Sequence, residues 1–338
     1  DSHPHIGSNK LPKIVENIRQ TIENNGGLVK FDAKVTDLII KGNEVKGVIV
    51  NDESEYIADS VILATGHSAR DIYSLLKSRG ITIEQKSFAI GVRIEHPQEL
   101  IDQIQYHSKN RHVNLPAANY RLSCQVDDKG VYSFCMCPGG LIVPASTDQN
   151  EIVINGMSIS RRDSPYANSG IVVTVDETDW HTFNNHGVFA GLEFQKDIER
   201  KFYNLGGSKL TAPSQRVTDF VSNKLSESLP ETSYIPGVRS VLLSELLPPV
   251  LSKALSSAFK IFNRRMKGFI TEEAQILAPE SRTSSPIRIL RDDTTLMHVN
   301  IQGLFPSGEG AGYAGGIVSS AIDGERCALA AVNYLSMK

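Results

Sequence analysis

The segment Gly308–Gly316 constrains the fold of this chain more than any other stretch. It reads Gly-Glu-Gly-Ala-Gly-Tyr-Ala-Gly-Gly, and apolar residues follow it at helical spacing over 317–335. Glycines at the start of a helix let a ligand approach the backbone closely. The free N–H groups and the positive end of the helix dipole then favour negative charge. The segment therefore predicts an anion-binding turn before a C-terminal helix, although a plain tight turn before a packed helix has the same pattern.

Gly310, Gly312 and Gly315 also fit the spacing G-x-G-x-x-G. A dinucleotide fingerprint of that form opens a βαβ unit and has an acidic residue about 20 positions further on. Only 23 residues follow Gly315, the last acid is Glu325, and no second strand fits after the helix. We therefore interpret this match as a coincidence of glycine spacing.

Hydrophobic periodicity predicts α/β structure at both ends of the chain and a different organisation between them. Helices are expected at 11–22, 72–76 and 317–335, and strands at 28–31, 34–40, 44–50, 60–64 and 295–301. The run Ser60–Ala64 is continuously apolar, which is typical of a buried parallel strand, and it ends in Thr65–Gly66. The middle is expected to hold a strand at 87–95, a helix at 97–105, short strands over 120–175 and mainly helices over 192–275.

Composition limits the classes of protein to which the chain can belong. A formal net charge of −3 gives no bulk attraction for nucleic acid. Cys124, Cys135, Cys137 and Cys327 are too few for a disulfide framework and fit a reducing, cytoplasmic compartment. No apolar run reaches about 18 residues, so no transmembrane helix is expected. Because the sequence opens at Asp1 and not at Met, we expect a preceding segment.

Short motifs spread over nearly the whole chain point together to one family. They are Gly303–Gly310, Ala314–Ile317, His5–Leu11, Ala64–Asp71, Ser133–Gly140, Asn155–Ser158, Ala212–Val217 and Arg282–Pro286. The first two resemble the second FAD motif of glutathione-reductase-like flavoproteins. Taken together, the motifs resemble a bacterial family of FAD-dependent dehydrogenases, also called NAD(FAD)-utilising dehydrogenases.

The resemblance implies a set of cofactor-binding residues. They are Val35, Ala64, Thr65, Gly66, Gly308, Glu309, Gly310, Ala311, Gly315, Gly316 and Ile317. The C-terminal helix would aim its N-terminus at the flavin C2 carbonyl, where negative charge gathers on reduction. Glu309 would accept hydrogen bonds from ribityl hydroxyls, at a place where the wider superfamily usually has Asp. Ala64–Gly66 would pass the cofactor, and Val35 would recognise the adenine edge.

Two polar clusters outside the glycine segment carry further hypotheses. Arg282 with Ser284 would bind a substrate carboxylate or phosphate, because a guanidinium offers two parallel donors. The alternative for this cluster is a loop that caps helices and pairs with Glu280. Cys135-x-Cys137 would ligate a metal, form a redox pair or face the flavin, but the spacing favours two small buried residues on one face of a strand. We predict catalytic roles for Arg282 and Ser284 and no metal site.

The implied fold is α/β. An FAD/NAD(P)-binding (Rossmann-like) domain, incomplete at its N-terminus, would comprise residues 1–85 and 287–338, and an inserted α+β domain would comprise 86–286. The element that grips the FAD pyrophosphate would precede Asp1, so we expect this chain alone to hold FAD poorly and to be inactive.

The implied activity is FAD-dependent oxidoreduction, with hydride transfer through flavin N5, a small-molecule substrate and NAD(P)H as electron donor. The alternative is a non-catalytic flavin- or nucleotide-binding scaffold or sensor. Neither nucleic acid nor a membrane is expected as a partner. Self-association through an exposed sheet edge is expected instead.

Overall fold

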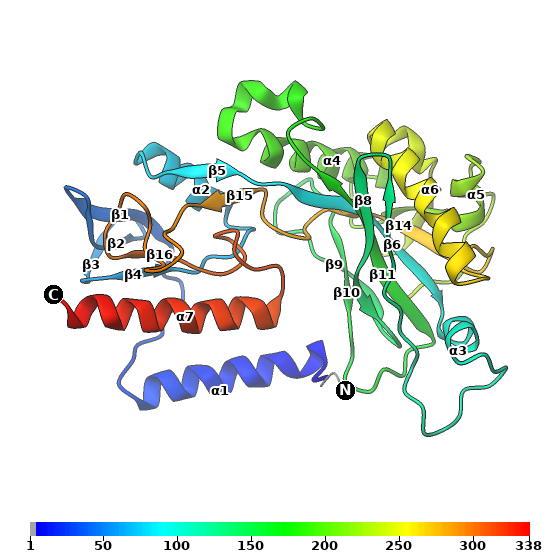
Figure 1. Ribbon diagram of the computed structural model, residues 1–338, viewed down its shortest axis with the longest axis horizontal. Helices are drawn as coiled ribbons and strands as arrows, with labels where there is room; N and C mark the ends of the chain where they lie inside the picture. Colours follow the sequence, from blue (N-terminus) through cyan, green and yellow to red (C-terminus); the bar gives the residue numbers. More distant parts are fainter. Residues whose placement is uncertain (1–4) are drawn as a thin grey trace. The chain divides into compact units, whose positions relative to one another are not determined.

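The computed structural model describes residues 5–338, so the prediction about Asp1 lies outside the described residues. The chain divides into two compact units (Figure 1). Unit 1 contains the described residues up to 27 together with 89–175 and 195–283, and unit 2 contains 28–88, 176–194 and 284–338. The sequence had instead placed the N-terminal residues with the FAD-binding domain and 176–194 with the inserted domain.

Hydrogen bonds account for both differences. The backbone N–H of Ser8 donates to the carbonyl oxygen of Ser158 at 2.7 Å, which ties the N-terminal residues to unit 1. The indole N–H of Trp180 donates to Oε1 of Gln85 at 2.7 Å, which ties residues 176–194 to unit 2. Neither contact is visible in the sequence, because each joins segments that are far apart along the chain.

Unit 2 has a mixed α/β architecture. Its strands are β1 (Val35–Lys41), β2 (Glu44–Val50), β3 (Ser54–Ile57), β4 (Val61–Leu63), β5 (Ile83–Gln85), β15 (Ile287–Ile289) and β16 (Leu304–Pro306), and its helices are α2 (Arg70–Ser78), the 3-10 helix η2 (His181–Phe189) and α7 (Ile317–Ser336). β1, β2 and β3 form an antiparallel sheet, and β5 pairs antiparallel with β15. β4 and β16 pair in parallel, and α7 packs on both. The predicted parallel strand and C-terminal helix are confirmed, and with them the α/β class.

Unit 1 is built on a seven-stranded sheet of order β13-β12-β14-β6-β11-β8-β7. The strands of unit 1 are β6 (Phe88–Pro97, which begins in unit 2), β7 (Ser123–Val126), β8 (Lys129–Cys137), β9 (Leu141–Pro144), β10 (Ile154–Met157), β11 (Tyr166–Val175), β12 (Ala212–Arg216), β13 (Val238–Ser240) and β14 (Gln275–Glu280). β9 and β10 form a separate two-stranded sheet. The helices of unit 1 are η1 (Ser8–Lys10), α1 (Leu11–Asn24), α3 (Gln98–Tyr106), α4 (Ala190–Gly206, which begins in unit 2), α5 (Val217–Val221), η3 (Leu243–Glu245) and α6 (Pro249–Arg265). α6 packs on β7, β8 and β11. Strands mixed with helices in this way agree with the predicted α+β character.

Two predicted strands are absent from the described structure. Residues 28–31 are irregular, with Leu28 and Phe31 exposed, because no neighbouring strand supplies hydrogen-bond partners there. Residues 296–301 are irregular and follow a turn at 293–295, where the carboxylate of Asp292 accepts hydrogen bonds from the N–H groups of Thr294 and Thr295. Within this segment, His298 forms only an isolated antiparallel bridge, with Arg291. The strand of this region is β16, a few residues later.

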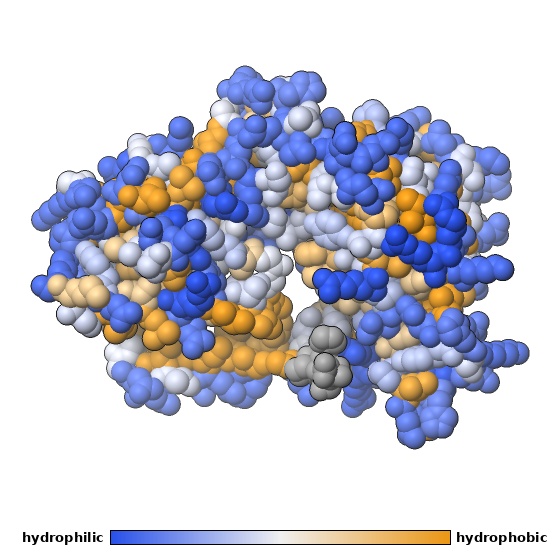
Figure 2. Space-filling view, in the orientation of Figure 1, coloured by the Kyte–Doolittle hydropathy of each residue, from blue (hydrophilic) through white to orange (hydrophobic). Residues whose placement is uncertain are grey.

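Apolar side chains gather on the surface of α7 (Figure 2). The exposed ones are Ile317, Val318, Ile322, Leu329, Val332 and Leu335. The opposite side of the helix carries the buried Cys327 and Ala331, which pack with Phe305 of β16. Within the described residues, no helix is both long and apolar enough to span a bilayer.

A close backbone approach in unit 1 generates a stability prediction. A Cβ added to Gly91 of β6 would lie 2.0 Å from the carbonyl oxygen of Ile171 in β11. We expect Gly91→Ala to lower the free energy of unfolding by about 1–3 kcal/mol, because the two central strands would have to separate. Denaturant titration followed by circular dichroism measures this change.

The matched control is Gly130→Ala in β8. A Cβ there would make ordinary contact, 3.4 Å from Cγ2 of Thr174. The control is expected to stay within about 1 kcal/mol of the parent chain. Equal losses in the two variants would contradict the proposed close approach at Gly91.

Candidate functional site

Two loops leave the parallel pair of unit 2 at the same edge. Leu63 and Pro306 are partners in the register of β4 and β16, so the segments that follow them start side by side. Gly310 packs directly on Gly66, where an added Cβ would lie 2.5 Å from the carbonyl carbon of Gly66. Gly66 and Gly308 have φ angles of 73° and 76°, which other residues rarely adopt. In open α/β sheets, ligands bind outside the carboxyl ends of the strands, which is where these glycines lie.

Tyr73 of α2 holds the glycine segment from the interior. Its hydroxyl donates to the carbonyl oxygen of Gly310 at 2.8 Å and lies 3.0 Å from Oγ of Ser285. Burial raises the pKa of Tyr73 to about 12, so the phenol stays protonated and can donate. Sequence reasoning missed this residue, because Tyr73 occupies the buried face of an ordinary amphipathic helix.

A buried ion pair fixes the other side of the same turn. The guanidinium of Arg291 donates to both carboxylate oxygens of Asp323 in α7, at 2.6 and 2.9 Å. It also donates to the carbonyl oxygen of Pro306 at 2.7 Å and lies 3.8 Å from the ring centroid of Tyr313. The N–H of Gly308 donates to the same carboxylate at 2.8 Å. α7 and the glycine turn are therefore joined through one aspartate.

These contacts set the ionisation of Asp323. Burial alone would favour the neutral acid. The hydrogen bonds from Arg291 and from the N–H of Gly308, with the nearby positive charge, outweigh it and hold the pKa of Asp323 below its ordinary value of 3.8. The carboxylate is therefore charged at neutral pH and available to both donors.

The N-terminus of α7 is open. Gly316 is the N-cap in extended conformation, no side chain caps the helix, and its first turn carries no acid. The nearest atom to a Cβ added at Gly316 would be Oγ of Ser319, 3.8 Å away. The hydroxyl of Ser307 is buried and has no hydrogen-bond partner among residues 5–338. An open helix N-terminus and a buried hydroxyl without a partner fit a ligand that carries negative charge and hydrogen-bonding groups, as FAD does.

Glu309 lies beside this turn. One of its carboxylate oxygens is 3.2 Å from Nδ1 of His67, which follows β4, although the two atoms are not in hydrogen-bonding geometry, and the Glu309 side chain is 29% exposed. Partial exposure leaves oxygen lone pairs accessible to a ligand hydroxyl. The predicted ribityl-binding role is therefore sterically open.

Some of the other predicted cofactor residues lie at this turn, and others lie away from it. Ala64 and Thr65 are exposed directly after β4, and Gly315 and Ile317 are exposed at the start of α7. Ala311 is 1% exposed and belongs to the core of unit 2. Val35 begins β1, which belongs to another sheet. Ala64–Gly66 and Gly308–Gly310 are thus brought together, whereas Val35 is held in the separate β1-β2-β3 sheet.

Arg282 lies in unit 1, where its side chain is 7% exposed and ion-paired. Its nitrogens lie 3.1 and 3.2 Å from the carboxylate of Glu199 and 3.4 Å from that of Glu151. The suggested alternative pairing with Glu280 is wrong, because that carboxylate is held by Arg93. Ser284 belongs to unit 2, where its hydroxyl accepts a 3.4 Å hydrogen bond from Lys86. Arg282 and Ser284 therefore fall in different units.

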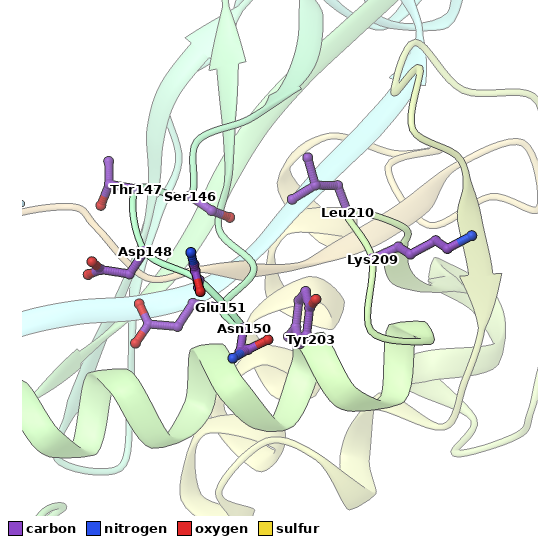
Figure 3. Close-up of a pocket in the computed structure, with 9 residues that line it drawn as sticks. Ser146, Thr147, Asp148, Asn150, Glu151, Tyr203, Lys209 and Leu210 are labelled. Carbon is purple, nitrogen blue, oxygen red and sulfur yellow. The ribbon is translucent and has the colours of Figure 1, made fainter.

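A cavity of about 510 Å³ lies next to the acidic partners of Arg282 (Figure 3). The loop 146–151 forms one wall, Tyr203 projects from α4, and Lys209 and Leu210 lie across from the loop. Glu151 belongs both to this lining and to the ion pair with Arg282. The guanidinium of Arg282 therefore contacts the cavity wall through its ion pair with Glu151.

The Cys135-x-Cys137 pattern gives a further correction. Cys137 is buried but Cys135 is exposed, so the two do not form the expected buried pair on one strand face. The pairing of β8 with β11 shifts register at this point, and Cys135 has a φ of 45°. Within residues 5–338, no group of three or more His, Cys, Asp or Glu side chains is arranged to hold a metal ion.

Comparisons with known families agree with this architecture. Residues 87–283 match the family model described as "FAD-dependent protein, C-terminal domain-like", and residues 11–110 match "Glucose inhibited division protein A". The first match covers more than half of the chain, which therefore belongs to the FAD-dependent protein family that this model defines. The Rossmann-like α/β assignment is confirmed, and FAD is the cofactor of the family.

Individual relatives span more than this chain. An uncharacterized protein of Clostridium beijerinckii is 41% identical over 332 residues, which are 97% of this chain and 61% of that protein. A tRNA uridine 5-carboxymethylaminomethyl modification enzyme MnmG of Lactobacillus delbrueckii subsp. bulgaricus is 44% identical over 55 residues, 16% of this chain and 9% of that enzyme. A crystal structure of an oxidoreductase from Methanosarcina mazei covers 94% of this chain and 53% of its own, with 13% identity and a TM-score of 0.36.

The Arg291–Asp323 pair generates a pH prediction. Because the folded pKa of Asp323 is depressed, its stabilising effect is present above about pH 4 and is lost as the pH falls through the folded pKa. Asp323→Asn should lower the free energy of unfolding at neutral pH by about 3–5 kcal/mol, since Arg291 would remain buried without its charge partner. It should also flatten the loss of stability as the pH falls below about 4.

Glu325→Gln, an exposed position on the same helix, is the control. It should retain the parent stability and the parent pH slope in denaturant titrations. A steep acid transition that persists unchanged in Asp323→Asn would show that other carboxylates cause it.

Proposed function

We propose that this chain contributes the FAD-contacting turn of an FAD-dependent oxidoreductase that acts on a small-molecule substrate. The observation that carries the proposal is the meeting of Ala64–Gly66 with Gly308–Gly310 at the carboxyl ends of β4 and β16. The open N-terminus of α7 and the family match support it. The finer features, hydride transfer and a nicotinamide donor, belong to the same proposal.

When bound, FAD supplies two-electron chemistry through hydride transfer at flavin N5. The residues of this chain position the cofactor. The N–H groups at the start of α7 would face its electron-rich end and favour negative charge there. Tyr73 and the Arg291–Asp323 pair would keep Gly308–Gly310 rigid, so that the turn does not have to reorganise when charge develops.

A non-catalytic flavin-binding scaffold is the main competing proposal. Anaerobic titration of the FAD-loaded protein with NADH and NADPH separates the two, using both this chain and the longer Clostridium relative. Bleaching of the flavin absorbance by either donor is expected for the oxidoreductase. A flavin that binds but is reduced by neither NADH nor NADPH would favour the scaffold.

RNA modification is a second candidate, favoured by the local similarity to MnmG enzymes. That similarity covers 16% of the chain, whereas the first family model spans 87–283. The net charge of −3 gives no bulk attraction for RNA. Salt-dependent retardation of a tRNA by the chain on a native gel would revive this candidate.

Glu309 provides the residue-level test. Glu309→Ala should weaken FAD binding by about 1.5–3 kcal/mol, roughly ten- to a hundredfold, because a charged acceptor for a ligand hydroxyl is lost. Fluorescence titration with FAD measures the change. His67→Gln, which removes the neighbouring imidazole but keeps the carboxylate, should cost less, and Glu325→Ala should cost nothing. FAD affinity that is the same in Glu309→Ala and the parent would remove this carboxylate from the site.

A further inference from the structure

A β-bulge in unit 1 reshapes β8 around Cys135. Phe134 faces Gly170 of β11 and Cys137 faces Asn168, so Cys135 and Met136 together oppose one residue of the partner strand. Cys135 has a φ of 45°, a conformation that costs free energy for any residue other than glycine. A bulge reorients side chains, and here it turns Cys135 outward while Cys137 stays buried.

The bulge is held from the interior by Arg93. This guanidinium is fully buried and donates to both carboxylate oxygens of Glu280, at 2.7 and 2.8 Å. It also donates to Oδ1 of Asn168 at 2.8 Å and to the carbonyl oxygen of Cys135 at 3.2 Å. A buried ion pair that supports a strained backbone fixes one conformation, so the outward Cys135 is a specified feature of the fold.

A cavity of about 450 Å³ opens over the bulge, entirely within unit 1. It is lined by Asn119, Tyr120, Arg121, Tyr132, Ser133, Phe134, Cys135, Met136, Pro138 and Arg162. Its volume falls in the range of about 300–1,000 Å³ that is typical of small-molecule sites. Two of the lining residues are arginines and none is acidic, although the chain as a whole has a net charge of −3.

The two arginines are available to a ligand. Among the described residues, neither the Arg121 nor the Arg162 guanidinium has a hydrogen bond or an ion pair, and Nε of Arg162 is buried without a partner. Arg162 is held in place by its backbone: its φ is 53°, and its carbonyl lies 2.0 Å from the position of a Cβ at Gly139. A guanidinium prefers a bidentate contact with a carboxylate. Burying a guanidinium without a partner costs free energy.

The lining also contains Tyr120 and an apolar surface. Tyr120 is 5% exposed, and its buried hydroxyl lies near Ser169 but makes no hydrogen bond of ordinary geometry within residues 5–338. The rings of Tyr132 and Phe134 and the thioether of Met136 supply the apolar part of the wall, which suits a flat ring.

We propose that this cavity binds a small aromatic carboxylate, with the carboxylate on Arg162 and Arg121 and the ring against Tyr132 and Phe134. The exposed Cys135 forms part of the same wall. Binding depends on unit 1 alone and requires no flavin. That such a carboxylate is the substrate rests on the proposed oxidoreductase function.

The test uses the 338-residue chain without added FAD and three probes. Benzoate carries both the ring and the charge, benzamide carries the ring alone, and inorganic phosphate carries the charge alone. Isothermal titration should show benzoate binding about tenfold more tightly than either of the others, since it alone satisfies both parts of the site. Benzoate should also slow alkylation of Cys135 by the neutral reagent iodoacetamide, measured by peptide mass spectrometry.

Arg162→Asn removes the guanidinium with little backbone cost, because Asn tolerates the left-handed conformation. Benzoate should bind this variant about tenfold more weakly, with no protection of Cys135. Arg161→Asn, an exposed neighbour outside the lining, should match the parent chain. Thermal unfolding of both variants shows whether the fold is kept, and the alkylation assay on the parent chain tests the proposal even if Arg162→Asn fails to fold.

Several outcomes would overturn the proposal. They are no benzoate binding to the parent chain, equal binding by Arg162→Asn, or phosphate or benzamide binding as tightly as benzoate. A failure of nicotinamide to reduce the flavin would refute the proposed oxidoreductase activity instead and would leave the binding result unchanged.

Discussion

The parallel pairing of β4 with β16 is the constraint on which the candidate cofactor site depends. These two short strands come from distant parts of the chain, and their register places Leu63 opposite Pro306. The backbone that leaves each strand must then turn at the same edge. The two turns touch there: Gly310 has no room for a Cβ against the backbone of Gly66, and Gly66 itself has a φ of 73°, which favours glycine. Every other feature of the turn, from the hydroxyl of Tyr73 to the start of α7, is arranged around that contact.

Both units use a buried arginine to hold a backbone segment in an uncommon conformation. In unit 2, Arg291 pairs with Asp323 and fixes the glycine turn through the N–H of Gly308. In unit 1, Arg93 pairs with Glu280 and supports the bulge at Cys135. Burying such a pair adds little stability over an apolar core, but removing one partner is costly. The pairs therefore contribute to each fold by specifying one geometry and penalising its alternatives.

The sequence predicted local features well where a single element carried the signal. The helices at 11–24 and 317–336, the strand at 61–63 and the glycine turn follow from periodicity and from the backbone freedom of glycine. It failed where a partner was needed. The β-prone residues 28–31 remain irregular for want of a neighbouring strand, and the Cys135 pattern was misjudged because a bulge needs two strands to exist.

The candidate sites divide in the same way. The sequence by itself determined that Gly308–Gly316 would form a turn before a helix and, with the family motifs, that the turn belongs to an FAD-dependent fold. Only the tertiary structure decided that Tyr73, Arg291 and Asp323 brace this turn, that Arg282 pairs with Glu199, and that two arginines share the lining of one cavity. The physical reason is that backbone conformation depends on neighbouring residues, whereas ion pairs and cavities depend on which distant segments the core brings together.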